Sequence, residues 1–177
     1  MNISVGKHFL KVVDEIPQIP EDIQSRFSNI NPIRFFPYNE LSRLNRAYMF
    51  LSEARGTHAI QSKVSNYIMC LECMFSTDAI EITHKVCERV AFFINDENHT
   101  KKAIFELIKS AYDVRSKYVH GQKLPSKTST FNQLKELSEK MDDLIRRVFL
   151  KIIKTDTDVF SFGDTPLNEY YKDLILE

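Results

Sequence analysis

Arg115 and His120 are the residues of this sequence whose types and spacing best suit chemistry on a phosphate group. Both lie in the segment YDVRSKYVHG, residues 112–121, with four residues between them. An imidazole takes up and releases protons near neutral pH. A guanidinium holds phosphate oxygens and stabilises the negative charge that develops as they react. The pair therefore indicates phosphoryl transfer, and the structural alternative is a buried Arg followed by a His that only caps a helix.

The helix that must position Arg115 is predicted to run from about residue 99 to residue 119. Its apolar residues recur at helical spacing within one arc of roughly 140°, and Arg115 falls near the middle of that arc. The residues of the arc are Ile104, Leu107, Ile108, Ala111, Tyr112, Tyr118 and Val119. Because an unpaired guanidinium is costly to bury, either a carboxylate meets it inside the protein or the arc faces a polar cleft. Glu72, the one charged residue between Tyr67 and Phe75, is the candidate partner; the alternative is that Glu72 faces solvent.

His120 needs a helix end in order to approach Arg115. In an uninterrupted helix it would point about 140° away from Arg115. Gly121 follows directly, and glycine commonly ends helices by adopting a left-handed conformation. The sequence therefore predicts that the helix ends at His120 and that both side chains face one cleft.

The positive charge of the chain is unevenly distributed. Lys plus Arg equals Asp plus Glu at 24 residues each, so the overall charge favours no class of partner. Between Lys101 and Lys127, however, seven basic residues stand against two acidic ones. Such a segment suits a phosphate backbone, which makes Lys117, Lys123 and Lys127 candidate substrate-binding residues. The alternative is an ordinary solvated face of lysines.

Composition favours an all-α protein in a reducing compartment. The chain has 177 residues with 13 Phe, 7 Tyr and only 4 Gly, which leaves little room for the turns of an all-β fold. Three Cys and no signal peptide indicate the cytoplasm, and no apolar run is long enough to span a membrane. Cys70 and Cys73 form a C-x-x-C pair inside a continuous helical run without a second pair. We therefore interpret them as core cysteines and expect neither a metal nor a cofactor.

The apolar periodicity predicts an up-down four-helix bundle. The core helices are expected near residues 57–76, 79–95, 99–119 and 130–154, preceded by helical spacing over 38–54. Capping boxes are predicted at Asp78 with Glu81 and at Thr130 with Gln133. We divide the chain into an N-terminal helical appendage, 1–36, and a bundle domain, 37–177, which ends in a short helix starting at Thr165-Pro166.

The segment RSKYVHG at the end of the third core helix resembles the HEPN superfamily. The signature of that superfamily is an Arg, four to six residues and a His, often with a small polar residue after the Arg. The resemblance is greatest to the ApeA-like branch over residues 57–121, including LECMFSTDAIEITHKVCERVAFFI and AYDVRSKYVHG. It extends over roughly residues 38–155 and is absent from the first 36.

The resemblance implies a metal-independent endoribonuclease that acts as a homodimer, with the two Arg/His pairs lining a shared cleft. The 2′-OH of single-stranded RNA would attack the adjacent phosphorus. His120 would be the general acid or base, Arg115 the phosphate clamp, and Ser116 a polar aid to positioning. The biological setting would be phage defence or a toxin system with an antitoxin or sensor partner.

One position departs from the family pattern. HEPN toxins paired with nucleotidyltransferase antitoxins usually carry a Tyr two residues after the His, and this chain has Gln122 there, which puts that mode of silencing in doubt. A second hypothesis, from a different class of function, stands beside the first. In it, Arg115 and His120 only hold together a non-catalytic dimerisation or interaction module, or a regulatory sensor domain.

Overall fold

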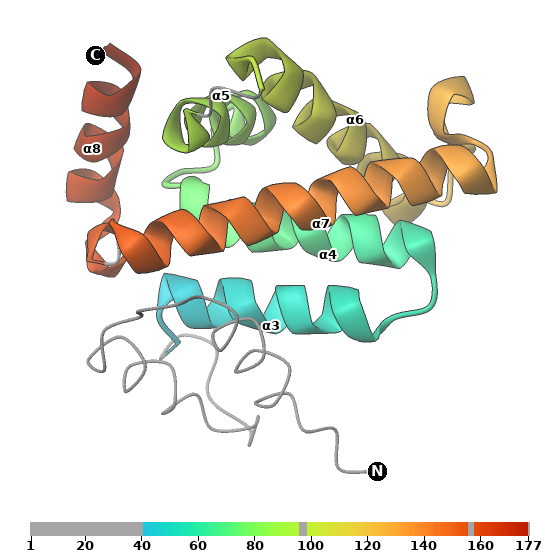
Figure 1. The fold of residues 1–177 in the computed structure, drawn as a ribbon, viewed down its shortest axis with the longest axis horizontal. Helices are drawn as coiled ribbons and strands as arrows, with labels where there is room; N and C mark the ends of the chain where they lie inside the picture. The colour runs from blue at the N-terminus through green and yellow to red at the C-terminus, as the bar shows by residue number, and fades with distance from the viewer. Residues whose placement is uncertain (1–40, 96–98, 156–157, 177) are drawn as a thin grey trace, which may run out of the picture.

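Every regular element is a helix in the part of the chain that the computed structural model describes, which is residues 41–95, 99–155 and 158–176 (Figure 1). The helices are α3 (Arg43–Gly56), α4 (Ile60–Phe75), α5 (Ile82–Ile94), α6 (Lys101–Val119), α7 (Phe131–Lys154) and α8 (Asp164–Leu176), with short 3-10 turns at Ser126–Thr128 and Val159–Ser161. The predicted all-α class is confirmed for these residues. The appendage at 1–36 and its boundary lie outside them. Among the described helices, none has both the length and the apolar character needed to cross a membrane.

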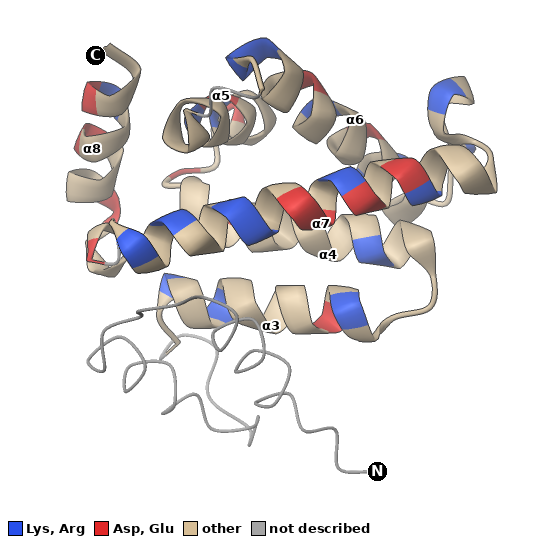
Figure 2. Cartoon of the chain, in the orientation of Figure 1, with Lys and Arg blue, Asp and Glu red and all other residues tan. Residues whose placement is uncertain are grey.

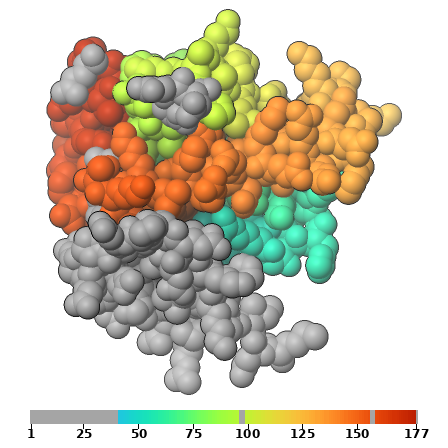
Figure 3. Space-filling model, in the orientation of Figure 1, coloured from blue at the N-terminus to red at the C-terminus, as the bar shows by residue number. Residues whose placement is uncertain are grey.

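Helix α4 is the central element of the fold. It packs against α3, α5, α6 and α7, and α3 and α7 run alongside it in Figure 1. Seen from outside, α7 crosses one face, with the α5–α6 pair on one side of it and α8 at its end (Figure 3). The sequence explains this place, because the run from Tyr67 to Phe75 is apolar on nearly every side and is stable only when covered on several faces.

The middle and the C-terminal end of α4 are held by different kinds of contact. Near its middle, the hydroxyl of Tyr67 donates to Asp142 of α7 at 2.9 Å, and Arg55 of α3 reaches the same carboxylate oxygen at 3.2 Å. At its C-terminal end, Phe75 packs against Phe93 and Phe160 with ring centroids 5.4 and 5.7 Å apart. Polar contacts thus align three helices, while an aromatic cluster fills the core beside α8.

Helix α5 begins later than its sequence suggests. The carboxylate of Asp78 does not cap it; the side chain accepts instead from the backbone N–H of Ile80 at 2.8 Å and binds Lys85 at 2.8 Å. The helix starts at Ile82 after Glu81, which has a left-handed conformation at φ 51° and makes no side-chain cap. The predicted capping box at Asp78 is therefore wrong, and Ile80, which precedes the observed start of the helix, is 68% exposed.

The ends of α6 and α7 follow local sequence signals. Thr130 and Gln133 form the predicted capping box at the start of α7. Gly121 has φ +63°, and the N–H groups of Gly121 and Gln122 bond to the carbonyls of Tyr118 and Lys117 at 3.2 and 2.8 Å. These two bonds make a Schellman motif, which is the glycine-terminated helix end that the sequence predicted.

Three apolar residues near these ends are not in the core. Tyr118 and Val119, which the apolar arc of α6 predicts to be buried, are 44 and 62% exposed, and Phe131, the first residue of α7, is 67% exposed. Tyr118 and Val119 lie on the same side of α6 as the buried Ile108 and Ala111. That expectation is wrong because, in the described part of the chain, nothing covers this face over the last turn of α6.

Candidate functional site

Arg115 lies at an open pocket of about 560 Å³, hereafter the Arg115 pocket. The pocket is enclosed by α3, α4, the α4–α5 loop and the starts of α5 and α8. Its charged lining residues are Arg43, Arg46, Arg115, Glu72, Asp78 and Asp164, and its larger apolar ones are Phe50, Met69, Cys73 and Ile82. The sequence left two alternatives for Arg115, a carboxylate partner or a polar cleft. The structure shows both, because Arg115 lies beside Glu72 in the lining of this pocket.

Glu72 and Arg115 meet at one edge of this pocket. The Arg115 Nη2 atom lies 3.5 Å from Glu72 Oε2, and the two side chains are 36% and 21% exposed. This separation is at the long limit for a hydrogen bond, so the pair is a loose one. The hydroxyl of Tyr112 is buried nearby, and its pKa is raised by burial and by the charge of Glu72. The tyrosine therefore stays neutral as part of the wall behind the ion pair.

His120 is exposed at the C-terminal end of α6, where its backbone N–H bonds to the carbonyl of Ser116 at 3.2 Å. Among the described residues, those that line the Arg115 pocket do not include His120. Within one copy of the chain, the pocket that receives Arg115 is therefore not also formed by His120. The expectation that both side chains face one cleft is not met by this pocket.

The other predicted site residues are found around the same helix end. Ser116 is exposed one residue beyond Arg115, and Lys123 and Lys127 are exposed in the loop that follows α6. Lys117 is different, because its ammonium group donates to the side chain of Gln122 at 2.8 Å and so braces the Schellman turn. The structure thus gives Lys117 a local structural contact and leaves Lys123 and Lys127 accessible.

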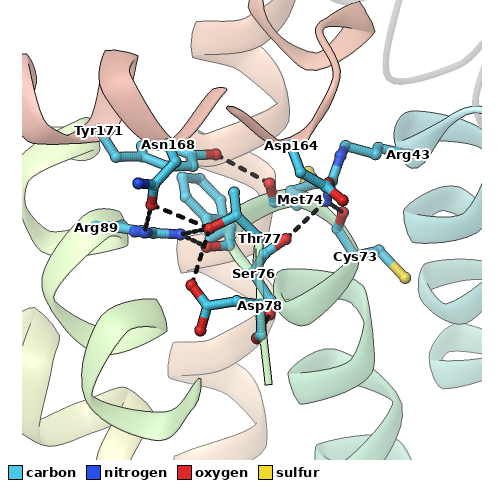
Figure 4. Close-up of polar contacts among 11 residues, drawn as sticks. Arg43, Cys73, Met74, Ser76, Thr77, Asp78, Arg89, Asp164, Asn168 and Tyr171 are labelled. Atoms are coloured by element: carbon cyan, nitrogen blue, oxygen red, sulfur yellow. Dashed lines mark hydrogen bonds and ion pairs between the residues drawn. The ribbon is translucent and has the colours of Figure 1, made fainter. Parts of the chain in front are cut away.

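Two arginines that sequence reasoning missed close the C-terminal end of α4 (Figure 4). Arg89 of α5 is 5% exposed and donates to the carbonyl of Phe75 at 2.8 Å, to Thr77 at 3.0 Å and to Asn168 of α8 at 2.6 Å. Arg43 of α3 donates to the carbonyls of Cys73 and Ser76 at 3.1 and 2.7 Å.

The ring of Tyr171 completes this arrangement. It lies 4.6 Å below the Arg89 guanidinium, and its hydroxyl donates to the carbonyl of Met74 at 2.9 Å. The carbonyls that a helix leaves unpaired in its last turn are thus bound by side chains from three other helices. Burial lowers the pKa of Arg89, which nevertheless stays charged because an arginine titrates far above neutral pH. The cluster holds α8 to the core, and its members Arg43, Cys73, Ser76 and Thr77 also line the Arg115 pocket.

Positive charge outside the site also gathers on α7. Its last third, from Arg146 to Lys154, carries only basic charges, whereas acidic and basic residues alternate before it (Figure 2). Two of these basic side chains make contacts within the protein. Arg147 binds Asp143 at 3.0 Å, and Lys151 donates to the carbonyl of Phe93 at 2.6 Å. We therefore do not assign the end of α7 to the site.

In the described part of the chain, no three His, Cys, Asp or Glu residues lie close enough together to bind a metal ion. Cys70 and Cys87 are buried free thiols, as expected for core cysteines, but Cys73 is only partly buried and lines the Arg115 pocket.

No protein-family model, curated protein sequence or solved structure matches this chain.

Proposed function

We propose that this chain is a HEPN-type endoribonuclease, an up-down four-helix bundle that cleaves single-stranded RNA in the cytoplasm without a metal or another cofactor. The observation that supports the proposal best is the placement of Arg115. It lies on the apolar face of α6 yet is 36% exposed at an open pocket, in a single 3.5 Å contact with Glu72. A guanidinium held this loosely remains available to phosphate oxygens, which it binds in a planar fork.

The proposed reaction is a transesterification within the RNA. The 2′-oxygen forms a bond to the adjacent phosphorus while the bond from phosphorus to the 5′-oxygen breaks, giving a 2′,3′-cyclic phosphate and a 5′-hydroxyl end. His120 takes the proton from the 2′-OH or gives one to the leaving 5′-oxygen. Arg115 binds the non-bridging oxygens and stabilises their growing charge, and Ser116 helps to orient the phosphate. Lys117, Lys123 and Lys127 bind the backbone on either side.

A homodimer is part of this proposal. His120 and the Arg115 pocket do not meet within one chain, and the apolar face of α6 beside them is uncovered at Tyr118 and Val119. A second copy placed against that face would cover it and bring a second Arg/His pair near the first. In phage defence or a toxin system, an antitoxin or sensor partner would then control the dimer.

The decisive experiment is an RNA cleavage assay with the full chain and its His120→Ala variant in the presence of EDTA. Wild type should cut single-stranded RNA, leave 2′,3′-cyclic phosphate ends that mass spectrometry identifies, and spare DNA of the same sequence because DNA lacks the 2′-OH. Cleavage that His120→Ala does not slow, or cleavage that EDTA abolishes, would contradict the proposal.

The second candidate function is a non-catalytic dimerisation or interaction module, or a sensor domain. The exposed Tyr118 and Val119 favour it, because uncovered apolar residues beside a helix end suit binding to another protein surface. A folded wild-type dimer that binds RNA but cleaves none would favour this candidate.

A further inference from the structure

The charges that line the Arg115 pocket cancel one another. Three arginines stand against three carboxylates. Within the lining, Glu72 pairs with Arg115 and Asp164 with Arg43. The third carboxylate, Asp78, binds Lys85 beside the pocket, and Arg46 is the third arginine. A pocket lined in this way does not as a whole attract an anion. The lining therefore suits an uncharged part of a ligand, and the loosely held Arg115 is suited to its phosphate.

Part of the pocket lining suits an apolar group. Phe50, Met69 and Ile82 line it, and each is partly buried against neighbouring helices. The volume of about 560 Å³ lies within the range of about 300–1,000 Å³ that small-molecule sites occupy. Nucleic-acid bases have this character, since proteins commonly hold unstacked bases against aromatic and apolar side chains.

Glu72 adds a hydrogen-bond acceptor to the pocket lining beside Arg115. Its contact with Arg115 uses one carboxylate oxygen at 3.5 Å, and an ionised carboxylate has about four lone-pair sites. Adenine, cytosine and guanine each offer an exocyclic amino group to such an acceptor, and guanine adds a neighbouring ring N–H. Uracil offers one N–H between two carbonyl oxygens, which a carboxylate repels. The lining thus selects for an amino group.

We propose that the Arg115 pocket receives an unpaired base with an exocyclic amino group, guanine above all, from the nucleotide whose phosphate Arg115 holds. This inference rests on the proposed ribonuclease function and adds a sequence preference to it. Arg115 then contacts the phosphate at the mouth of the pocket, Glu72 accepts from the amino group, and Phe50 packs against the ring. Wild-type cleavage is expected next to G, A or C and suppressed next to U.

Binding to this pocket can be measured without any cleavage, because Cys73 lies in its wall. Cys70 and Cys87 are fully buried, and burial raises the pKa of both thiols, that of Cys87 to about 12. Iodoacetamide should therefore alkylate Cys73 first, as peptide mass spectrometry would show. Saturating 5′-GMP should slow the alkylation of Cys73 several-fold, while 5′-UMP at the same concentration should leave it unchanged.

Two variants test which side chains give the preference. Glu72→Gln keeps the size of the side chain but replaces one acceptor oxygen with a donor, so the preference for G over U should fall about tenfold. Phe50→Leu keeps an apolar wall without a ring and should weaken 5′-GMP binding about fivefold or more. Phe131→Leu is the matched control, since Phe131 is an exposed ring outside the pocket, and it should change neither measurement.

The outcomes separate this inference from the proposed function. RNA cleavage with equal rates next to all four bases, or a preference that Glu72→Gln leaves intact, would overturn the base pocket while the ribonuclease stands. Absence of cleavage together with protection of Cys73 by 5′-GMP but not by 5′-UMP would overturn the ribonuclease and support the pocket as a nucleotide site. Equal protection by both nucleotides, or none by either, would overturn the pocket whatever the RNA assay gives.

Discussion

The guanidinium of Arg115 and the carboxylate of Glu72 face each other across the edge of an open pocket, 3.5 Å apart and both partly exposed. A partly exposed ion pair at this distance contributes about 1 kcal/mol or less to folding stability. The cost of keeping a guanidinium on the apolar face of α6 is therefore not offset by a strong salt bridge. A role in binding gives this residue a physical reason to be there.

Arg115→Ala should for this reason harm activity far more than folding. Loss of the phosphate contact is expected to slow RNA cleavage about 10²–10³-fold. The free energy of unfolding should change by about 1 kcal/mol, because the lost contact is long and partly solvated. Urea denaturation followed by circular dichroism measures the second quantity. Arg115→Lys keeps the charge but not the planar fork, and recovery of full activity in that variant would show that charge alone suffices.

His120→Ala should remove activity and leave the fold unchanged. The side chain is exposed, and the hydrogen bond from residue 120 to the carbonyl of Ser116 is made by the backbone and survives the substitution. Cleavage should fall about 10²–10⁴-fold, as for loss of a general acid or base, with a stability change within about 0.5 kcal/mol. His84→Ala, which removes another exposed histidine, is the control. Equal activity in both variants would remove His120 from the mechanism.

The parts of the fold that could be predicted from the sequence are those set by neighbours along the chain. Thr130 and Gln133 start α7 because the two side chains satisfy N–H groups within one turn. Gly121 ends α6 because a left-handed residue is needed there, and a Cβ would strain it. Glu72 is the candidate partner of Arg115 in the sequence because a lone charge in an apolar run needs one, and only the structure decides between that contact and exposure to solvent.

The parts that could not be predicted depend on residues distant in the sequence. Arg89 is buried because its partners are a carbonyl at the end of another helix and Asn168, which lies 79 positions away. No periodicity in α5 reveals acceptors of this kind. Asp78 resembles a helix cap in the sequence, but its carboxylate binds Lys85 and a backbone N–H within the loop instead. The exposure of Tyr118 and Val119 likewise depends on what covers the end of α6, which helical spacing does not encode.

The uncovered face of α6 predicts a homodimer at tens of micromolar. Val119 is 62% exposed on the same side of the helix as the buried core residues, so burying it against a second copy removes apolar surface from water. Val119→Glu should shift light scattering from dimer to monomer, because a carboxylate would have to be desolvated in the interface. Leu176→Glu, at an 85% exposed position near the end of α8, should remain dimeric. Wild-type protein that is monomeric at this concentration would contradict the prediction.

Arg89→Met should destabilise the whole domain and loosen α8 in particular. The substitution keeps an apolar stem but removes three hydrogen bonds, to the carbonyl of Phe75, to Thr77 and to Asn168. A buried acceptor left without its donor costs about 1–3 kcal/mol, so we expect a loss of about 3 kcal/mol and a lower urea midpoint. Arg146→Met is the matched control, because Arg146 is half exposed and, among the described residues, pairs with its helix neighbour Asp143. It should lower the free energy of unfolding by less than about 1 kcal/mol. Hydrogen exchange should then show faster exchange in α8 of Arg89→Met than in α7. Equal midpoints for the two variants would mean that Arg89 does not hold α8 to the end of α4.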